Sequence, residues 1–162
     1  MVVIVGAHGP VISQKIMSKL MLTIGVEISI QVVACILKRK DKVLISSRPM
    51  GKEFSGYYEF PGGKVKAREF LLESLKREIL EELGVIINLE RVIFLKSYKI
   101  VQIKRKLNLN FFVCTDWSGK IKSKEGQNIN WVLVDELNGY EFLKSNKKFI
   151  DCLSYLVFPS TN

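Results

Sequence analysis

Three glutamates lie close together in a segment with helical periodicity, since Glu81 and Glu82 follow Glu78 by three and four positions. This spacing brings their carboxylates to one flank of a helix. The cluster costs stability, because like charges repel and the C-terminal end of a helix disfavours anions. Oxygen ligands on one face suit a hard cation such as Mg²⁺ or Mn²⁺, and a solvated acidic face is the alternative.

The helix that must position these carboxylates is predicted over Ser74–Leu83, with a start a few residues earlier, near Glu69. Gly84 follows as a C-terminal cap, because glycine adopts the left-handed conformation that ends many helices. At about 100° per residue a narrow apolar stripe faces a sheet. The stripe consists of Leu72, Leu75, Ile79 and Leu83.

Strands and a second helix are predicted on both sides of this segment. β-branched and apolar residues favour strands, and those expected here cover residues 27–37, 43–47, 92–103, 107–115 and 129–134. Residues 48–64 form a connection rich in glycine, proline and aromatic residues, and residues 146–156 predict a closing helix. The order indicates an α/β (α+β) fold with a mixed β-sheet sandwiched between helices.

Length and composition limit the function classes. The 162 residues make one domain, and no apolar run reaches the roughly 20 residues of a membrane helix. We interpret residues 1–22 as an N-terminal extension, with Met17 and Met21 as other possible starts, and residues 23–158 as the domain. The start of the chain lacks the pattern of a secretory signal.

Cysteine content and charge add two further limits. Three cysteines without a C-x-x-C pair, and a single histidine, argue against a disulfide framework or a Cys/His zinc site. They fit small core residues in a cytoplasmic protein. The formal charge of +9 favours anionic partners but does not choose between a nucleotide and a nucleic acid.

The residues around the glutamates favour the cation site over the solvated face. Gly63, Glu69 and the run Arg77–Val85 match every fixed position of the pattern G-x5-E-x7-R-E-U-x-E-E-x-G-U, in which U is aliphatic. This pattern is the Nudix box, so the chain resembles the Nudix hydrolases. The resemblance implies the Nudix fold and Mg²⁺, with Mn²⁺ as a substitute.

Other segments resemble the MutT branch of that family, which hydrolyses oxidised guanine nucleotides such as 8-oxo-dGTP. Glu59–Lys64 reads EFPGGK, Arg48 stands eleven residues before Glu59, and Lys124–Gln127 reads KEGQ shortly before Trp131. Asn146 matches the asparagine that reads the base. The resemblance covers roughly residues 26–156.

This resemblance implies roles for the acidic side chains and the glycines. Glu78 and Glu82 would ligate Mg²⁺ directly, and Glu81 would ligate through water or position the attacking water. Glu125 would be a further ligand or would activate the attacking water, with a solvated loop glutamate as the alternative. The main-chain carbonyl of Gly62 or Gly63 would add another.

A second group of residues would support the site or bind the substrate. Glu69 and Arg77 would pair and hold the loop against the helix, with an ordinary surface ion pair as the alternative. Arg48 would contact the triphosphate, and Asn146 would read the base or serve only as a helix N-cap. The remaining substrate-binding residues would be Glu59, Phe60, Pro61 and Gly62, with Phe60 also a candidate for the core.

Two positions depart from the MutT pattern. Arg68 stands where the box usually has glycine, and Glu53 stands where MutT has a histidine in the loop after its arginine.

The function implied is hydrolysis of nucleoside triphosphates, 8-oxo-dGTP first, to monophosphate and pyrophosphate, which cleans the nucleotide pool and protects DNA from mutation. The protein would be a cytoplasmic monomer without membrane or stable nucleic-acid partners. One alternative is another Nudix pyrophosphohydrolase that acts on RNA 5′ ends, dinucleotide polyphosphates or ADP-ribose. The other is a non-catalytic Nudix module that binds nucleotides or nucleic acid.

Overall fold

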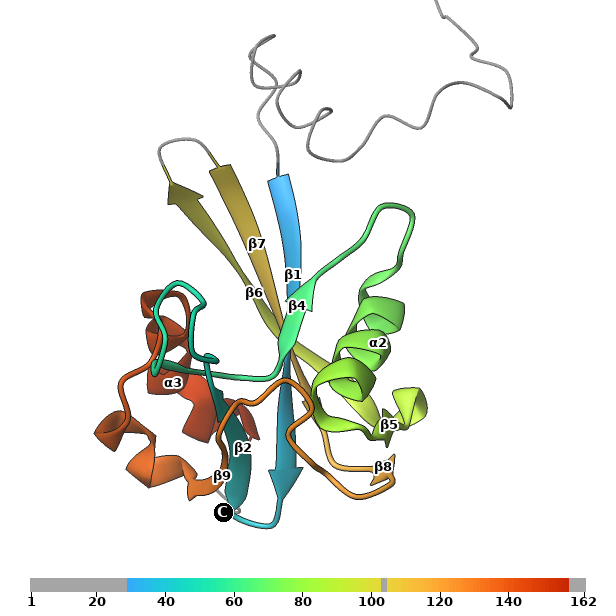
Figure 1. The fold of residues 1–162 in the computed structure, drawn as a ribbon, viewed down its shortest axis with the longest axis vertical. Coiled ribbons are helices and arrows are strands. Elements are labelled where there is room, and N and C mark those ends of the chain that lie inside the picture. Colours follow the sequence, from blue (N-terminus) through green and yellow to red (C-terminus); the bar gives the residue numbers. More distant parts are fainter. Residues whose placement is uncertain (1–28, 103–104, 158–162) are drawn as a thin grey trace, which may run out of the picture.

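The computed structural model describes residues 29–102 and 105–157 (Figure 1). The predicted extension at residues 1–22 lies outside these residues, so the proposed domain boundary stays a prediction. Among the described residues, no helix combines the length and apolar character needed to cross a membrane.

The centre of the fold is a mixed sheet in the order β3-β2-β1-β7-β6, with β4 added to β1 and β9 to β2. β1 and β7 run parallel, and every other pair in this sheet is antiparallel. The strands are β1 Ser29–Arg39, β2 Lys42–Ser47, β3 Tyr58–Glu59, β4 Gly62–Lys64, β6 Val92–Gln102, β7 Arg105–Cys114 and β9 Ile129–Leu133. The predicted mixed sheet is confirmed, and each long predicted strand is present within a few residues of its expected ends.

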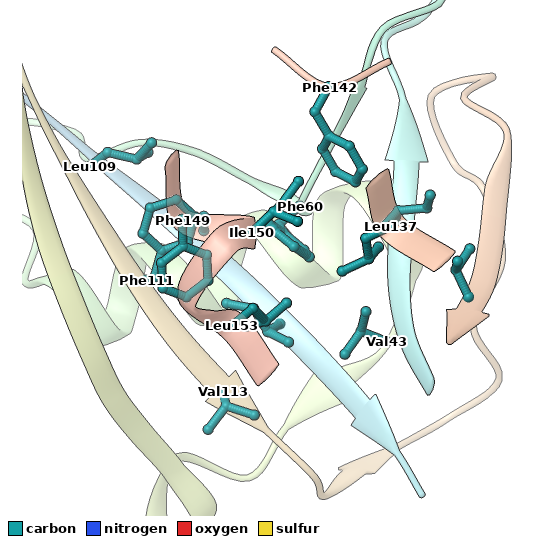
Figure 2. Packing of buried hydrophobic residues seen from close by; sticks show 14 residues of the cluster. Val43, Phe60, Leu109, Phe111, Val113, Leu137, Phe142, Phe149, Ile150 and Leu153 are labelled. Carbon is teal, nitrogen blue, oxygen red and sulfur yellow. The ribbon is translucent and has the colours of Figure 1, made fainter. Parts of the chain in front are cut away.

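Helices α2 (Leu71–Leu83) and α3 (Lys144–Val157) lie on opposite sides of the sheet (Figure 1). Each covers its own apolar cluster, which confirms the predicted sandwich. On the α3 side, the Phe111 and Phe149 rings stack with centroids 3.8 Å apart, and Phe60 meets both rings edge-on (Figure 2). Aromatic packing of this kind fixes α3 against the sheet.

Helix α2 begins and ends close to the predicted residues. Its first turn is closed by Glu73, whose carboxylate accepts a hydrogen bond from the Phe70 N–H, and Gly84 ends it with φ +70°. Leu75, Ile79 and Leu83 are buried, but the prediction for Leu72 was wrong, since this residue is 38% exposed. On the helical wheel Leu72 lies on the same side as the three buried residues. It is in the first turn of α2, however, and remains exposed there.

Several short elements were not predicted. These are β3 and β4 within the expected connection, a separate two-stranded antiparallel sheet of β5 Ile86–Ile87 and β8 Trp117–Ser118, and the 3-10 helices Leu89–Arg91 and Val134–Gly139. β4 depends on Gly62, where φ is +152° and a Cβ atom would lie 2.1 Å from the Val33 carbonyl oxygen. Only glycine permits this close pairing with β1. It places the main chain of Gly62 and Gly63 beside α2.

Two of the three cysteines are described in detail, and both fit the predicted core role. Cys35 and Cys114 are buried and free. Burial raises the pKa of each thiol, so both stay protonated at neutral pH. The side chain of Cys152 lies outside the described part.

Candidate active site

A cleft of about 450 Å³ brings most of the predicted site residues together. Glu78, Glu82 and Glu125 line it, and so does Asn146. Positive side chains and apolar side chains complete the wall: Arg48, Lys52 and Lys64, with Leu107, Leu109 and Leu143. One cavity therefore offers carboxylates for a cation, cations for phosphates and an apolar surface with an amide for a base.

Arg77 organises the carboxylates at the edge of this cleft. Its guanidinium donates to both oxygens of Glu69 at 2.7 and 2.8 Å, to Glu78 at 2.6 Å and to Glu81 at 3.1 Å. Another N–H donates to the Lys64 carbonyl oxygen at 3.2 Å, which ties β4 and the following loop to α2. Hydrogen bonds from Arg77 lower the pKa of Glu69 to about 2.

Within the described part of the chain, Glu82 has one hydrogen-bond donor, and its burial and acidic neighbours oppose its negative charge. It is partly buried, and its Oε2 accepts a hydrogen bond of 3.1 Å from the Gly62 N–H. The pKa of Glu82 is raised to about 8, chiefly by burial and also by the nearby charges of Glu59, Glu125 and Glu78, while the hydrogen bond from Gly62 opposes the rise. A partly buried acid among three other acids is a place where a divalent cation would be stabilised.

Glu78 lies against the glycine main chain of β4. A Cβ atom at position 63 would come within 2.5 Å of the Glu78 carboxyl carbon. Gly63 therefore leaves the space that this carboxylate occupies.

The carboxylates are not yet gathered as a ligand set, since the described residues contain no group of three or more acidic, histidine or cysteine side chains arranged around one point. Each one instead has a protein partner. Glu78 bonds Arg77, Glu82 bonds Gly62, and Glu125 bonds Lys52 at 3.0 Å. The donors still fit a hard cation, because carboxylates and a main-chain carbonyl are the oxygen ligands that Mg²⁺ takes.

The loop that carries Glu125 is anchored by Gln127, a residue for which the sequence suggested no role of its own. The buried Gln127 amide donates to the Glu82 carbonyl oxygen at 3.0 Å. Its oxygen accepts from the Glu125 N–H at 3.0 Å and from the Ser123 hydroxyl at 2.8 Å. Glu125 is thereby held beside the end of α2, where the loop before β9 passes (Figure 1). The sequence shows only a glutamine two residues after a candidate ligand, and its burial becomes apparent in the structure.

Arg48 and Glu59 form an ion pair across the mouth of the β2–β3 loop. One Arg48 nitrogen lies 3.0 Å from each Glu59 oxygen, and Arg48 Nε donates to the Glu53 main-chain oxygen at 2.7 Å. Burial raises the pKa of Glu59, and the Arg48 charge opposes that rise. Glu53, at the position where MutT has histidine, thus contributes its main chain to this arrangement.

Phe60 and Pro61 are placed in the interior rather than in the cleft wall. The Phe60 ring is 3% exposed and packs among Phe111, Phe142 and Phe149 (Figure 2). The Pro61 carbonyl accepts a hydrogen bond from the Cys35 N–H at 2.8 Å. For Phe60 the structure supports the core interpretation, with its main chain next to Asn146, and the substrate-binding role of Pro61 stays a prediction.

Asn146 is the third residue of α3, so the interpretation as an N-cap was wrong. The helix begins two residues earlier than expected, at Lys144. The Asn146 side chain is 4% exposed; its oxygen accepts from the Phe60 N–H at 3.5 Å and its nitrogen donates to the Ser145 hydroxyl at 3.2 Å. The long first contact leaves this amide capacity to bond a ligand in the cleft.

Two further residues stand apart from the cleft lining. Glu81 is 48% exposed and bonds Arg77.

Arg68 adopts φ +66°, the left-handed conformation that glycine would adopt without strain. The usual glycine of the box is therefore replaced here at a cost in backbone energy.

This fold and this site place the chain in a known class: the family model for the NUDIX domain matches residues 29–153, and the chain belongs to the Nudix family. It is a MutT-like Nudix hydrolase, and members of the family typically depend on a divalent metal.

One relative is an 8-oxo-dGTP diphosphatase of Buchnera aphidicola subsp. Schizaphis graminum, 37% identical over 127 residues, which are 78% of this chain and 95% of that protein. A CTP pyrophosphohydrolase of Escherichia coli K12 is 32% identical over 68% of this chain and 81% of its own length. The solution structure of the E. coli ORF135 protein aligns with a TM-score of 0.72 at 27% identity, covering 85% of this chain and 98% of that one.

Proposed function

We propose that this protein hydrolyses nucleoside triphosphates to monophosphate and pyrophosphate with Mg²⁺, and that 8-oxo-dGTP is its preferred substrate. The observation that carries the proposal is the single cleft shared by Glu78, Glu82, Glu125 and Asn146. Its cavity of about 450 Å³ lies in the range of small-molecule sites. Similarity to the 8-oxo-dGTP diphosphatase of Buchnera supports the same substrate class.

Glu78, Glu82 and Glu125 would hold the cation, with a main-chain carbonyl of Gly62 or Gly63. When bound, Mg²⁺ neutralises the phosphate oxygens and lowers the pKa of water. Arg77 keeps Glu78 close to β4, and Glu69 fixes Arg77 in turn. These contacts hold the Glu78 side chain beside β4 before the substrate arrives, which limits how far this carboxylate must move on binding.

Arg48 would bind the phosphates and a cleft carboxylate would take the proton of the attacking water. The planar Arg48 guanidinium is suited to phosphate oxygens, and its present partner is the half-buried Glu59. Water attacks the β-phosphorus, the bond to the oxygen that bridges the α-phosphorus breaks, and pyrophosphate leaves with the new oxygen. Glu81, exposed and bonded to Arg77, would act by positioning rather than by contact.

Asn146 would read the base. Oxidation at C8 of guanine turns N7 from an acceptor into an N–H donor, next to the O6 acceptor. One carboxamide can bond both groups, since it offers a donor and an acceptor. With normal dGTP its oxygen would face the N7 acceptor, and the buried polar group left unpaired costs about 1–3 kcal/mol.

A second candidate substrate is CTP, because one relative is a CTP pyrophosphohydrolase. Cytosine also presents a donor and an acceptor side by side, at N4 and N3. The same Asn146 amide could therefore bond either base, and the shape of the apolar wall would decide.

The setting proposed is a monomer in the cytoplasm, where the nucleotide pool lies, acting in nucleotide sanitisation and so in DNA repair. A non-catalytic binding module is disfavoured, because it has no need for the mutually repelling carboxylates. The test is product analysis in ¹⁸O-labelled water with Mg²⁺, for wild type and Glu78→Gln. We expect ¹⁸O in the pyrophosphate and a severe loss of turnover in the variant. Orthophosphate as the product, or normal turnover in the variant, would refute the proposal.

A further inference from the structure

Lys52 joins two loops across the cleft, and its contact with Glu125 has no part in the proposed mechanism. Its ammonium lies 3.0 Å from Glu125 Oε2, although the two residues are 73 positions apart in the chain. Both line the cleft. We call this ion pair the Lys52–Glu125 clasp.

The clasp joins two tight turns whose bases are fixed independently of it. Gly51 with φ +83° precedes Lys52, and Gly126 with φ +78° follows Glu125. The loops are tied at their base by the Ser47 N–H, which donates to the Asn128 carbonyl oxygen at 2.8 Å. The loop bases therefore keep their positions when the tip contact breaks.

Both side chains of the clasp can change partner. Their exposed fractions are 54% for Lys52 and 40% for Glu125, so water can replace either partner at small cost. Each also lies beside the chemistry of the cleft. Gln127 holds Glu125 at the end of α2, and the Lys52 charge lowers the pKa of Glu59, whose burial raises it.

We infer that Lys52 is a phosphate-binding residue that pairs with Glu125 only while the cleft is empty. When a metal–triphosphate complex binds, Glu125 turns to the cation and the freed Lys52 ammonium turns to the phosphate oxygens. Glu125 thus exchanges the Lys52 ammonium for the cation, and the same exchange gives the phosphates of the substrate a positive partner in Lys52. Lys52 would thus be a specificity residue for the charge of the polyphosphate. This inference rests on the proposed function.

The exchange predicts effects of opposite sign on two affinities. Without nucleotide, Lys52 competes with the cation for Glu125, so Lys52→Met should bind Mn²⁺ more tightly, by about 2- to 5-fold, the scale of an exposed ion pair. With nucleotide, the same variant loses a charged hydrogen bond to phosphate. Its affinity for a triphosphate should fall by about 5- to 20-fold.

The experiment measures both affinities at equilibrium, by calorimetry, on the intact protein. The probes are Mn²⁺ alone, and the α,β-imido analogues of dGTP and CTP compared with the corresponding monophosphates. Lys122→Met is the matched control, because Lys122 is an exposed lysine of the Glu125 loop that does not line the cleft. A Glu125→Gln background shows whether the Mn²⁺ effect passes through that carboxylate.

We expect Lys52→Met to tighten Mn²⁺ binding in the wild-type background alone, and to weaken the triphosphate analogues but not the monophosphates. Lys122→Met should change each affinity by less than about 2-fold, as for an exposed charge outside the cleft. Lys52→Met values equal to those of Lys122→Met in either affinity would overturn the inference. Failure of the proposed function has a different signature, namely a wild-type protein that releases no pyrophosphate from any triphosphate.

Discussion

Glu82→Gln should stabilise the metal-free protein at alkaline pH while it removes catalysis. The pKa of Glu82 stands at about 8 in the folded chain against a usual 4.5, because burial and three acidic neighbours oppose ionisation. For an acid whose folded pKa is raised, the stabilising contribution is full below the unfolded value and is lost as pH rises through the folded value. Between pH 4.5 and about 8 the metal-free wild type should therefore lose stability from this group.

From the pKa difference, the ionised Glu82 side chain lowers the free energy of unfolding at pH 9 by at most about 5 kcal/mol. Glutamine is itself polar and buried, so we expect a net gain of roughly 1–2 kcal/mol, or about 3–10 °C in Tm. At pH 5 the carboxyl of the wild type is protonated, and the two proteins should melt within about 2 °C of each other.

The assay is thermal unfolding in EDTA at pH 5 and pH 9, followed by titration with Mg²⁺. Mg²⁺ should raise the Tm of wild type and have little effect on Glu82→Gln, since binding to the folded state alone stabilises it. Glu141→Gln is the control, an exposed glutamate away from the cleft. A Tm of Glu82→Gln below that of wild type at pH 9 would refute this reasoning. So would a Tm difference between the two proteins that is the same at pH 5 and pH 9.

Three further variants test other parts of the site. Asn146→Ala should lower kcat/KM for 8-oxo-dGTP by about 5- to 150-fold and for dGTP much less; equal losses would leave Asn146 with only its contact to Phe60. Gly63→Ala adds a Cβ 2.5 Å from the Glu78 carboxyl carbon, so it should displace that side chain and cut turnover by about 10-fold or more with little change in Tm. Gly139→Ala is the control, because a Cβ atom added there contacts no other atom. Wild-type turnover in Gly63→Ala would contradict the geometry. Arg68→Gly should raise stability in urea by up to about 1 kcal/mol with unchanged activity, because φ +66° is strained for arginine; an unchanged or lower stability would show that no strain is stored there.

The layered fold could be predicted because its long elements have periodic sequences. The stripe at Leu75, Ile79 and Leu83 and the β-branched run of β1 bury large apolar areas, and burial of this kind dominates local preference. β3 and β4 are two and three residues long and contain no alternation, so their pairing with β2 and β1 depends on contacts far along the chain. Leu72 was mispredicted for a related reason. Its position on the helical wheel does not show how far along the helix the covering sheet extends.

The pair Glu69–Arg77 could be expected because the sequence resembles the Nudix box, and the structure contains this contact. The roles of Gln127 and Lys52 could not be expected, because each depends on a partner brought near by folding. Asn146 shows how a shift of two residues in a helix start removes one interpretation and leaves another.

The most direct test of the proposed activity is the ratio of kcat/KM values for 8-oxo-dGTP, dGTP and CTP, measured with the wild-type protein and Mg²⁺. We predict that 8-oxo-dGTP is preferred over dGTP by at least the 5- to 150-fold that about 1–3 kcal/mol from one amide contact supplies, and is preferred over CTP as well. Equal values for 8-oxo-dGTP and dGTP, or a preference for CTP, would contradict the assignment of oxidised guanine as the substrate.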